Sequence, residues 1–121
     1  MPRPITIQRR ATLLREALAV IEAEYARDLE LDDVARRIAT SRRQLQRCFD
    51  ELGDASFREC LTRERMDRAA DLLAGTGLTV KEVANRVGYR QPAQFAKAFR
   101  RRHGAAPTEF RAGLRAEALA A

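Results

Sequence analysis

Residues 29–41, LELDDVARRIATS, and residues 78–90, LTVKEVANRVGYR, are two copies of one pattern within a single chain. The matching residues are Val34, Ala35 and Arg37 in the first copy and, 49 residues later, Val83, Ala84 and Arg86 in the second. After a shift of one residue in the turn, the matches are Leu45, Arg47 and Phe49 with Phe95, Lys97 and Phe99, and the closing glycines are Gly53 and Gly104. The chain therefore contains an internal duplication, which its fold has to explain.

The duplicated segment has the spacing of a short helix, a tight turn and a longer helix. A small residue, Ala35 or Ala84, stands where two steeply crossing helices need their backbones close together. In the second turn, Gly88 allows a backbone angle that larger residues avoid. This is the helix-turn-helix pattern, and two copies in register are a stronger signal than one. We expect the helices of the first copy at residues 31–38 and 42–52. In the second copy we expect a short helix that begins after Thr79 and a longer one at 92–102.

Three further helices complete an expected all-α fold. They are an amphipathic helix over residues 7–26, a long helix over 56–73 and a weak last helix after Pro107. Thr79 and Glu82 predict a capping box before the second short helix. The residues expected to face inward from the first helix are Ile7, Ala11, Leu14, Leu18, Ile21 and Tyr25. We expect two helix-turn-helix subdomains joined by a long linker helix, divided as 1–54, 55–75 (the linker) and 76–121.

The charge balance indicates a polyanionic partner. Lys and Arg number 23 against 17 Asp and Glu, a net charge of +6, which leaves DNA, RNA and acidic membranes as partner classes. No run approaches the roughly 18 apolar residues of a membrane helix, so we expect a soluble, cytoplasmic protein without a membrane partner. Cys48 and Cys60 form no CxxC pair, and His103 has no ligand partner at a metal spacing. We therefore expect no metal and no cofactor.

The longer helix of each unit directs polar and cationic side chains away from the core. These residue types suit DNA, because Arg pairs bidentately with guanine and Gln with adenine. One such face is often only solvated surface, but two equivalent faces favour binding. The candidate DNA-binding residues are Arg42, Arg43, Gln46 and Arg47 in the first unit and Arg90, Gln91, Gln94, Lys97 and Arg101 in the second.

Residues 88–111, GYRQPAQFAKAFRRRHGAAPTEFR, resemble the second half of the AraC/XylS family signature. The shared features are a glycine followed by an aromatic residue, paired phenylalanines, a further glycine and a P-x-x-F-R ending. Residues 31–66 are similar to the upstream unit and linker helix of the same family, so the resemblance covers about residues 10–112. The departures from the family pattern are Glu30 at a helix cap, Cys60 in place of a frequent tyrosine, and Gln91-Pro92 at the start of the sixth helix.

The resemblance implies a bilobed domain whose two recognition helices enter the major groove on one face of double-stranded DNA. Their expected separation is about one DNA turn, roughly 34 Å, so that one chain reads an asymmetric site as a monomer. The resemblance also implies control of transcription, usually activation, with RNA polymerase as a partner. Because longer members carry a separate ligand-sensing or dimerising domain, a chain of 121 residues is expected to be either a small single-domain regulator or an excised C-terminal domain.

Two other interpretations remain open. A sequence-indifferent architectural DNA binder would also be cationic, and the ratio of affinities for a selected and a random duplex separates it from a specific reader. An enzyme would need an accessible thiolate at Cys48 or Cys60. We expect no enzyme, because both cysteines fall at helical core positions. Further candidates are Arg65, Arg101 and Arg102 for phosphate contacts and His103 for a helix cap or phosphate neighbour.

Overall fold

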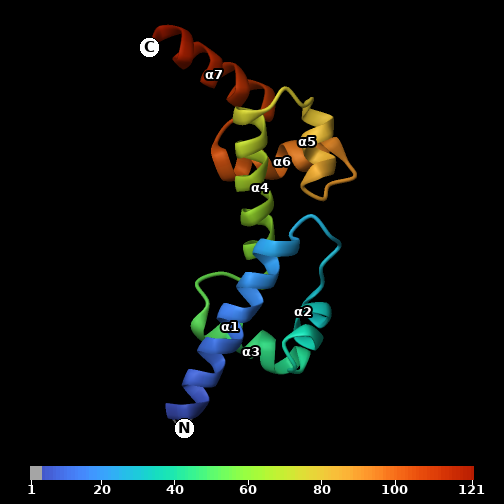
Figure 1. Ribbon diagram of the computed structural model, residues 1–121, viewed down its shortest axis with the longest axis vertical. Coiled ribbons are helices and arrows are strands. Elements are labelled where there is room, and N and C mark those ends of the chain that lie inside the picture. The colour runs from blue at the N-terminus through green and yellow to red at the C-terminus, as the bar shows by residue number, and fades with distance from the viewer. Residues whose placement is uncertain (1–3) are drawn as a thin grey trace. The chain divides into compact units, whose positions relative to one another are not determined.

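The computed structural model consists of α-helices joined by short connections (Figure 1). It describes the backbone of residues 4–121 and the side chains of residues 7–121, and this part of the chain contains no strand. Its helices are α1 (Pro4–Glu24), α2 (Leu31–Arg37), α3 (Arg42–Leu52), α4 (Phe57–Gly75), α5 (Val80–Arg86), α6 (Pro92–His103) and α7 (Pro107–Ala120). The predicted all-α fold with two helix-turn-helix pairs, α2–α3 and α5–α6, is confirmed.

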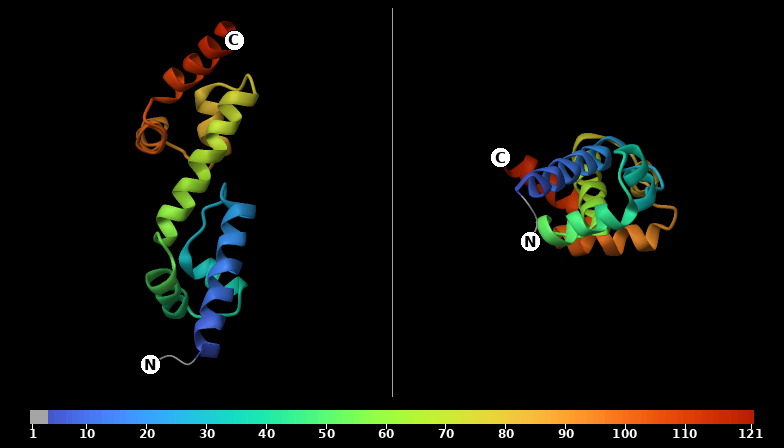
Figure 2. Two further views of the ribbon diagram at one scale, coloured as in Figure 1. Left: turned by 90° about the vertical axis from the view of Figure 1, so that its left-hand side faces the viewer. Right: turned by 90° about the horizontal axis from the view of Figure 1, so that it is seen from below.

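The chain divides into two compact units, which we call the N-terminal unit (Met1–Leu61) and the C-terminal unit (Thr62–Ala121). The N-terminal unit holds α1, α2, α3 and the first residues of α4. The C-terminal unit holds the rest of α4 with α5, α6 and α7. Within the N-terminal unit α1 packs against α2 and α3, and within the C-terminal unit α6 packs against α5 and α7 (Figure 2). Each helix-turn-helix pair thus has its own supporting helices.

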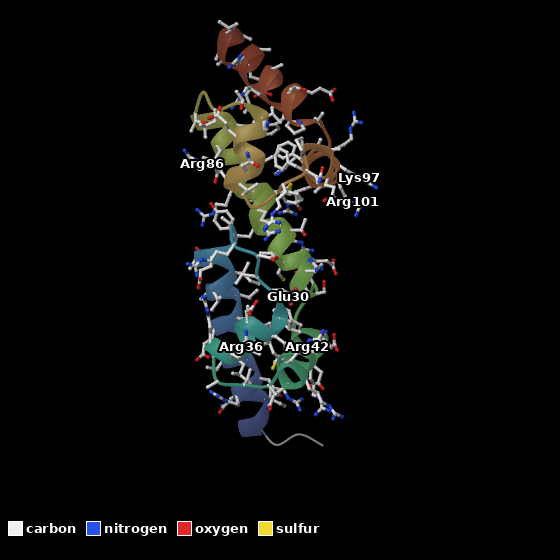
Figure 3. All side chains as sticks on the ribbon, turned by 90° about the vertical axis from the view of Figure 1, so that its right-hand side faces the viewer. Glu30, Arg36, Arg42, Arg86, Lys97 and Arg101 are labelled. Atoms are coloured by element: carbon white, nitrogen blue, oxygen red, sulfur yellow. The ribbon has the colours of Figure 1, made fainter. Side chains whose placement is uncertain are left out.

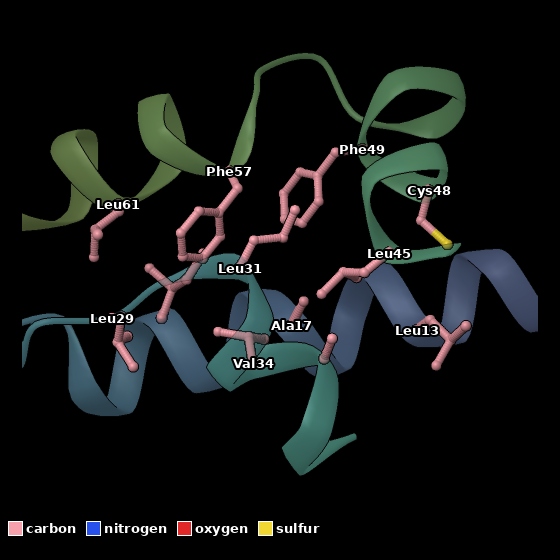
Figure 4. Packing of buried hydrophobic residues seen from close by; sticks show 12 residues of the cluster. Leu13, Ala17, Leu29, Leu31, Val34, Leu45, Cys48, Phe49, Phe57 and Leu61 are labelled. Atoms are coloured by element: carbon pink, nitrogen blue, oxygen red, sulfur yellow. The ribbon is translucent and has the colours of Figure 1, made fainter. Parts of the chain in front are cut away.

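One cluster of apolar side chains holds the N-terminal unit together (Figure 4). Leu13 of α1, Val34 of α2 and Leu45 of α3 meet in it and are almost completely buried. Phe49 of α3 meets Phe57 of α4 edge to face, with ring centroids 6.0 Å apart. Burying a side chain of this size stabilises the fold by about 1.5–3 kcal/mol. The cluster therefore fixes which side of α3 faces inward and leaves the polar side exposed.

The buried face of α1 differs from the predicted one. Ile7 and Leu18, both expected to face inward, are 46% and 40% exposed, whereas Leu13 and Ala17 are buried. Ile21 is buried as predicted. The helix carries two apolar stripes roughly a quarter turn apart, and packing against α2 and α3 selects one of them. α1 also begins at Pro4 instead of residue 7, because proline fits the first turn of a helix.

Capping hydrogen bonds set the starts of α3 and α5. At α3, the Ser41 hydroxyl accepts a hydrogen bond from the Gln44 backbone N–H at 3.1 Å. At α5, the Glu82 carboxylate accepts from Thr79 N at 3.0 Å and the Thr79 hydroxyl accepts from Glu82 N at 3.1 Å. The predicted capping box is therefore confirmed. The Thr79 backbone N–H, and after it the Thr79 hydroxyl, lower the pKa of Glu82 below its usual value.

An aromatic cluster forms the centre of the C-terminal unit. The rings of Phe95 and Phe99 on α6 lie 5.8 Å apart, and Phe110 of α7 meets Phe99 at 5.3 Å. The imidazole of His103 lies 4.5 Å from the Phe99 ring. Its Nε2 is 3.0 Å from the backbone oxygen of Met66 in α4. The aromatic packing thus holds α6 against α7, and the His103 contact joins α6 to α4.

The P-x-x-F-R ending of the sequence attaches α7 to the end of α4. Pro107 opens α7, and Phe110 enters the aromatic cluster. Arg111 donates from Nε to the Leu73 carbonyl at 3.1 Å and from Nη2 to the Thr76 carbonyl at 3.3 Å. Carbonyls at a helix C-terminus have no partner within the helix, so Arg111 satisfies groups that would otherwise need water.

Candidate nucleic-acid interface

The turns of the two helix-turn-helix units have the same hydrogen bonds. In the first turn Thr40 N donates to Ala35 O at 2.9 Å, and in the second Tyr89 N donates to Ala84 O at 2.9 Å. Both alanines are 1% exposed, which fits the predicted need for a small residue where the helices cross. The duplication seen in the sequence is therefore also a duplication of backbone geometry.

Each turn contains one residue in the left-handed region. Gly88 has φ 96°, a backbone angle that larger residues avoid, as the sequence predicted for this glycine. Ala39 has φ 58°. For a residue with a side chain this conformation costs about 1–2 kcal/mol. The turn hydrogen bonds from Ala39 N to Arg36 O and from Thr40 N to Ala35 O accompany it. Sequence reasoning did not assign this conformation to Ala39, although its alignment with Gly88 was a usable signal.

The four predicted side chains of α3 are all exposed, and they line one open hollow together with Asp50 and Glu51. The Arg42 Nε lies 3.9 Å from the Asp32 carboxylate at the start of α2. Gln46 donates from Nε2 to the Asp50 carboxylate at 3.0 Å. Sequence reasoning missed these two carboxylates as neighbours of the site. The exposed face of α3 therefore has mixed charge.

The predicted residues of the second unit are exposed as well. Because α6 begins where predicted, Gln91 is its N-cap residue and Arg90 lies in the preceding turn. Gln94, Lys97 and Arg101 are exposed on the helix. Lys97 and Arg101 lie one turn apart and project from the same side of α6 (Figure 3). The helix has no acidic residue, so this face is cationic.

Other predicted contacts are engaged inside the C-terminal unit. Arg102 donates from Nε and Nη2 to the two carboxylate oxygens of Asp67, each at 3.1 Å, and this carboxylate raises the pKa of Arg102. The guanidinium of Arg65 lies 5.7 Å from the centroid of the Tyr89 ring. The predicted cap role of His103 is wrong, because its ring packs in the aromatic cluster. A phosphate contact by Arg102 would first have to break its pair with Asp67.

Neither cysteine has the setting of a nucleophile. Cys48 is fully buried, and this burial raises the pKa of its thiol. Cys60 is half-buried, with Sγ 4.0 Å from the Ala55 carbonyl oxygen. A reactive cysteine needs an accessible thiolate, so these positions favour packing.

The described residues also bear on metals and membranes. Among them, no group of three or more His, Cys, Asp or Glu side chains is placed to hold a metal ion. None of the described helices combines the length and the apolar character needed to cross a bilayer.

Two helix-turn-helix units in one chain, each with an exposed polar recognition helix, define a double helix-turn-helix nucleic-acid-binding domain. Comparison with known proteins identifies its family. Residues 34–113 match the family model of a helix-turn-helix domain. The Msm operon regulatory protein of Streptococcus mutans is 32% identical over 92 residues, which are 76% of this chain and 33% of that protein. The chain spans about a third of the length of the curated relatives it matches.

Two solved structures are similar over most of their length. A transcriptional regulator with an AraC-type DNA-binding domain from Chromobacterium violaceum has 27% identity and a TM-score of 0.81, with 88% of this chain and 96% of that chain covered. The DNA-binding domain of AdpA, solved in complex with a target DNA, has 32% identity and a TM-score of 0.79, with 86% and 94% covered. This chain belongs to the AraC-type family of helix-turn-helix transcriptional regulators, as the resemblance in its sequence predicted.

Proposed function

We propose that the chain is a transcription regulator that recognises a specific double-stranded DNA sequence through both of its helix-turn-helix units. In this proposal α3 and α6 each enter the major groove, and together they read successive segments of one site. The chain carries out no chemistry of its own.

The observation that carries the proposal is the duplication of an exposed recognition helix after a turn that begins with the same hydrogen bonds. The paired hydrogen bonds Thr40–Ala35 and Tyr89–Ala84 end each short helix in the same way, before the chain enters the longer helix. A single exposed cationic helix is common on protein surfaces. Two such helices in one chain, each following a turn of this kind, are better explained by a shared function, and binding of DNA by both helices is such a function.

The predicted side chains suit contact with DNA in both units. All of them are exposed, and they combine guanidinium and amide groups, which recognise guanine and adenine edges in the major groove. Arg and Lys among them can also contact phosphates. The residues proposed to contact DNA are Arg42, Arg43, Gln46 and Arg47 of α3, Arg90 and Gln91 before α6, and Gln94, Lys97 and Arg101 of α6.

The regulatory role is proposed on the names of the relatives. The Streptococcus mutans protein is named as an operon regulatory protein. We infer that this chain acts in the cytoplasm, where DNA-binding regulators of its family meet their sites, and that it activates transcription by contact with RNA polymerase. We further propose that it binds as one chain, with residues 1–54 and 76–121 as the reading subdomains and 55–75 as their linker.

Selection of bound duplexes from a random pool tests the proposal. The dissociation constant is then measured for the selected site and for random DNA at one fixed salt concentration. A specific reader is expected to prefer the selected site by roughly a thousandfold or more. A ratio near one would contradict sequence-specific recognition and favour an architectural DNA binder.

A further inference from the structure

The two helix-turn-helix units carry opposite charges at equivalent positions. Asp32 in the first turn of α2 corresponds to Lys81 of α5. Asp50 near the end of α3 corresponds to Arg100 of α6. The buried alanine and the first hydrogen bonds of the turn are kept in both copies, whereas these charge differences lie on exposed residues.

Carboxylates of the N-terminal unit pair with the cations of its short helix. The Arg36 guanidinium lies 2.6 Å from the Asp33 carboxylate. Arg37 pairs with Glu24 of α1. Both arginines of α2 are therefore already neutralised within the unit.

The same arrangement extends to the recognition helix α3. Glu30, Asp32, Arg42 and Gln46 line a hollow of about 340 Å³ in which Arg42 and Asp32 approach to 3.9 Å, and Figure 3 labels Glu30 and Arg42 there. Gln46 is held by Asp50 on the next turn. The cations of α3 that form no ion pair with any described residue are then Arg43 and Arg47, two of the four predicted DNA-binding residues of this helix. We call such exposed, unpaired cations open cations.

In the C-terminal unit, several exposed cations have no carboxylate partner among the residues that the structure describes. Arg100 and Arg102 have carboxylate partners, Glu109 at 3.3 Å and Asp67 at 3.1 Å. Exposed cations of this unit that form no ion pair with any residue that the structure describes include Lys81, Arg90, Lys97 and Arg101.

Salt-dependent DNA affinity comes from protein cations that replace the counterions around phosphates. A guanidinium already paired with a carboxylate adds little to this exchange, because the pair is nearly neutral and must open before the cation can bind. The open cations of the C-terminal unit have no such cost.

We propose that the two units contribute unequally to DNA binding, an inference that rests on the proposed function. The C-terminal unit supplies most of the phosphate anchorage through Lys81, Arg90, Lys97 and Arg101. The N-terminal unit contributes mainly base discrimination, because its own carboxylates restrain Arg36, Arg37 and Arg42. Asp32 is thus a positioning residue that acts through Arg42.

The salt dependence of binding separates the two contributions. Lys97→Gln and Arg101→Gln should each make the slope of log affinity against log salt shallower by about 0.9, one phosphate contact each. Both changes should weaken binding to the selected site and to random DNA by the same factor. Arg36→Gln removes the same charge from a paired arginine and should leave the slope nearly unchanged.

Asp32→Asn gives a test in the opposite direction. Releasing Arg42 should strengthen binding to random DNA by about two- to fivefold, the range expected from one exposed ion pair, and should steepen the slope. Glu16→Gln is the matched control, because it removes one carboxylate from the exposed side of α1 in the same unit. It should change the slope by less than Asp32→Asn does.

If the unaltered chain prefers its selected site, three results would each contradict the unequal contribution of the two units without contradicting the proposed function. They are an equal slope change for Arg36→Gln and Arg101→Gln, an equal effect of Asp32→Asn and Glu16→Gln, and a Lys97→Gln variant with altered base preference but an unchanged slope. If the unaltered chain shows no preference for any duplex, the proposed function itself fails. All five substitutions lie on exposed side chains, and circular dichroism confirms that each variant is folded.

Discussion

Replacing Arg111 by alanine should detach the end of α7 from α4. The guanidinium makes two hydrogen bonds to backbone carbonyls, Leu73 O at 3.1 Å and Thr76 O at 3.3 Å. The first is part-buried and the second exposed. Removing the side chain leaves the Leu73 carbonyl, in the last turn of α4, without this donor.

The expected loss is about 2–3 kcal/mol in the free energy of unfolding. A hydrogen bond from a charged donor contributes about 1.5–3 kcal/mol when it is shielded from water. Of the two bonds, only the one to the Leu73 carbonyl is part-buried, so only this bond contributes that amount. The exposed bond to Thr76 and the attraction of a cation to a helix C-terminus add a few tenths to about 1 kcal/mol. Arg111→Lys keeps the positive charge but lacks the two guanidinium N–H donors that contact both carbonyls. It should therefore restore less than half of the free energy of unfolding that Arg111→Ala loses.

Urea denaturation followed by circular dichroism measures the effect. Arg115→Ala is the control, because Arg115 lies one turn further along α7 and is exposed, and it should change stability by no more than about 0.5 kcal/mol. The selectivity between a bound site and random DNA should stay unchanged for the folded Arg111→Ala protein. A loss no larger than that of Arg115→Ala would refute the role assigned to Arg111.

Three further predictions concern the recognition helix α3, the two turns and the buried thiol of Cys48. Arg43→Ala and Arg47→Ala should each relax base preference at one position by about 1–3 kcal/mol in a selection experiment; equal weakening on every sequence would mean phosphate anchoring instead. Gly88→Ala should lower the free energy of unfolding by about 1 kcal/mol, since a left-handed side chain costs about 1–2 kcal/mol and the stiffer unfolded chain returns 0.4–1; Ala39→Gly should be neutral or stabilising, and the opposite order in urea would be inconsistent with the turn geometry. Because burial raises the pKa of Cys48, a thiol reagent at neutral pH should label that residue only after denaturation; rapid native labelling would show that the thiol is accessible.

Helix positions and the repeat could be predicted from the sequence because they depend on local patterns. Apolar residues at three- and four-residue spacing marked α2, α3, α5 and α6, and the Thr79–Glu82 spacing marked a cap that forms as expected. The inward face of α1 could not be chosen in this way. Its sequence offers two apolar stripes, and only packing against α2 and α3 decides between Leu13 and Ile7.

The polar surroundings of the site depended on contacts between distant positions. The Asp67–Arg102 pair joins residues 35 positions apart, and Arg111 reaches carbonyls of α4 from α7. Such partners leave no periodic signal in the sequence. The Gln46–Asp50 bond is local, with the four-residue spacing of neighbours on a helix face. The Asp50 carboxylate was not predicted as a neighbour of the site, because only cationic and amide side chains were candidates for DNA contact.

Recognition of one site by both units makes binding depend on helical phase. About 5 bp inserted between the two halves of the selected site turns one half to the opposite side of the duplex, because a DNA turn takes about 10–10.5 bp. We expect this insertion to reduce affinity to nearly that for random DNA, while the mass of the complex on the unaltered site corresponds to one chain. Full affinity for the 5-bp variant would mean that only one unit reads bases, and two chains on a palindromic site would contradict binding as a monomer.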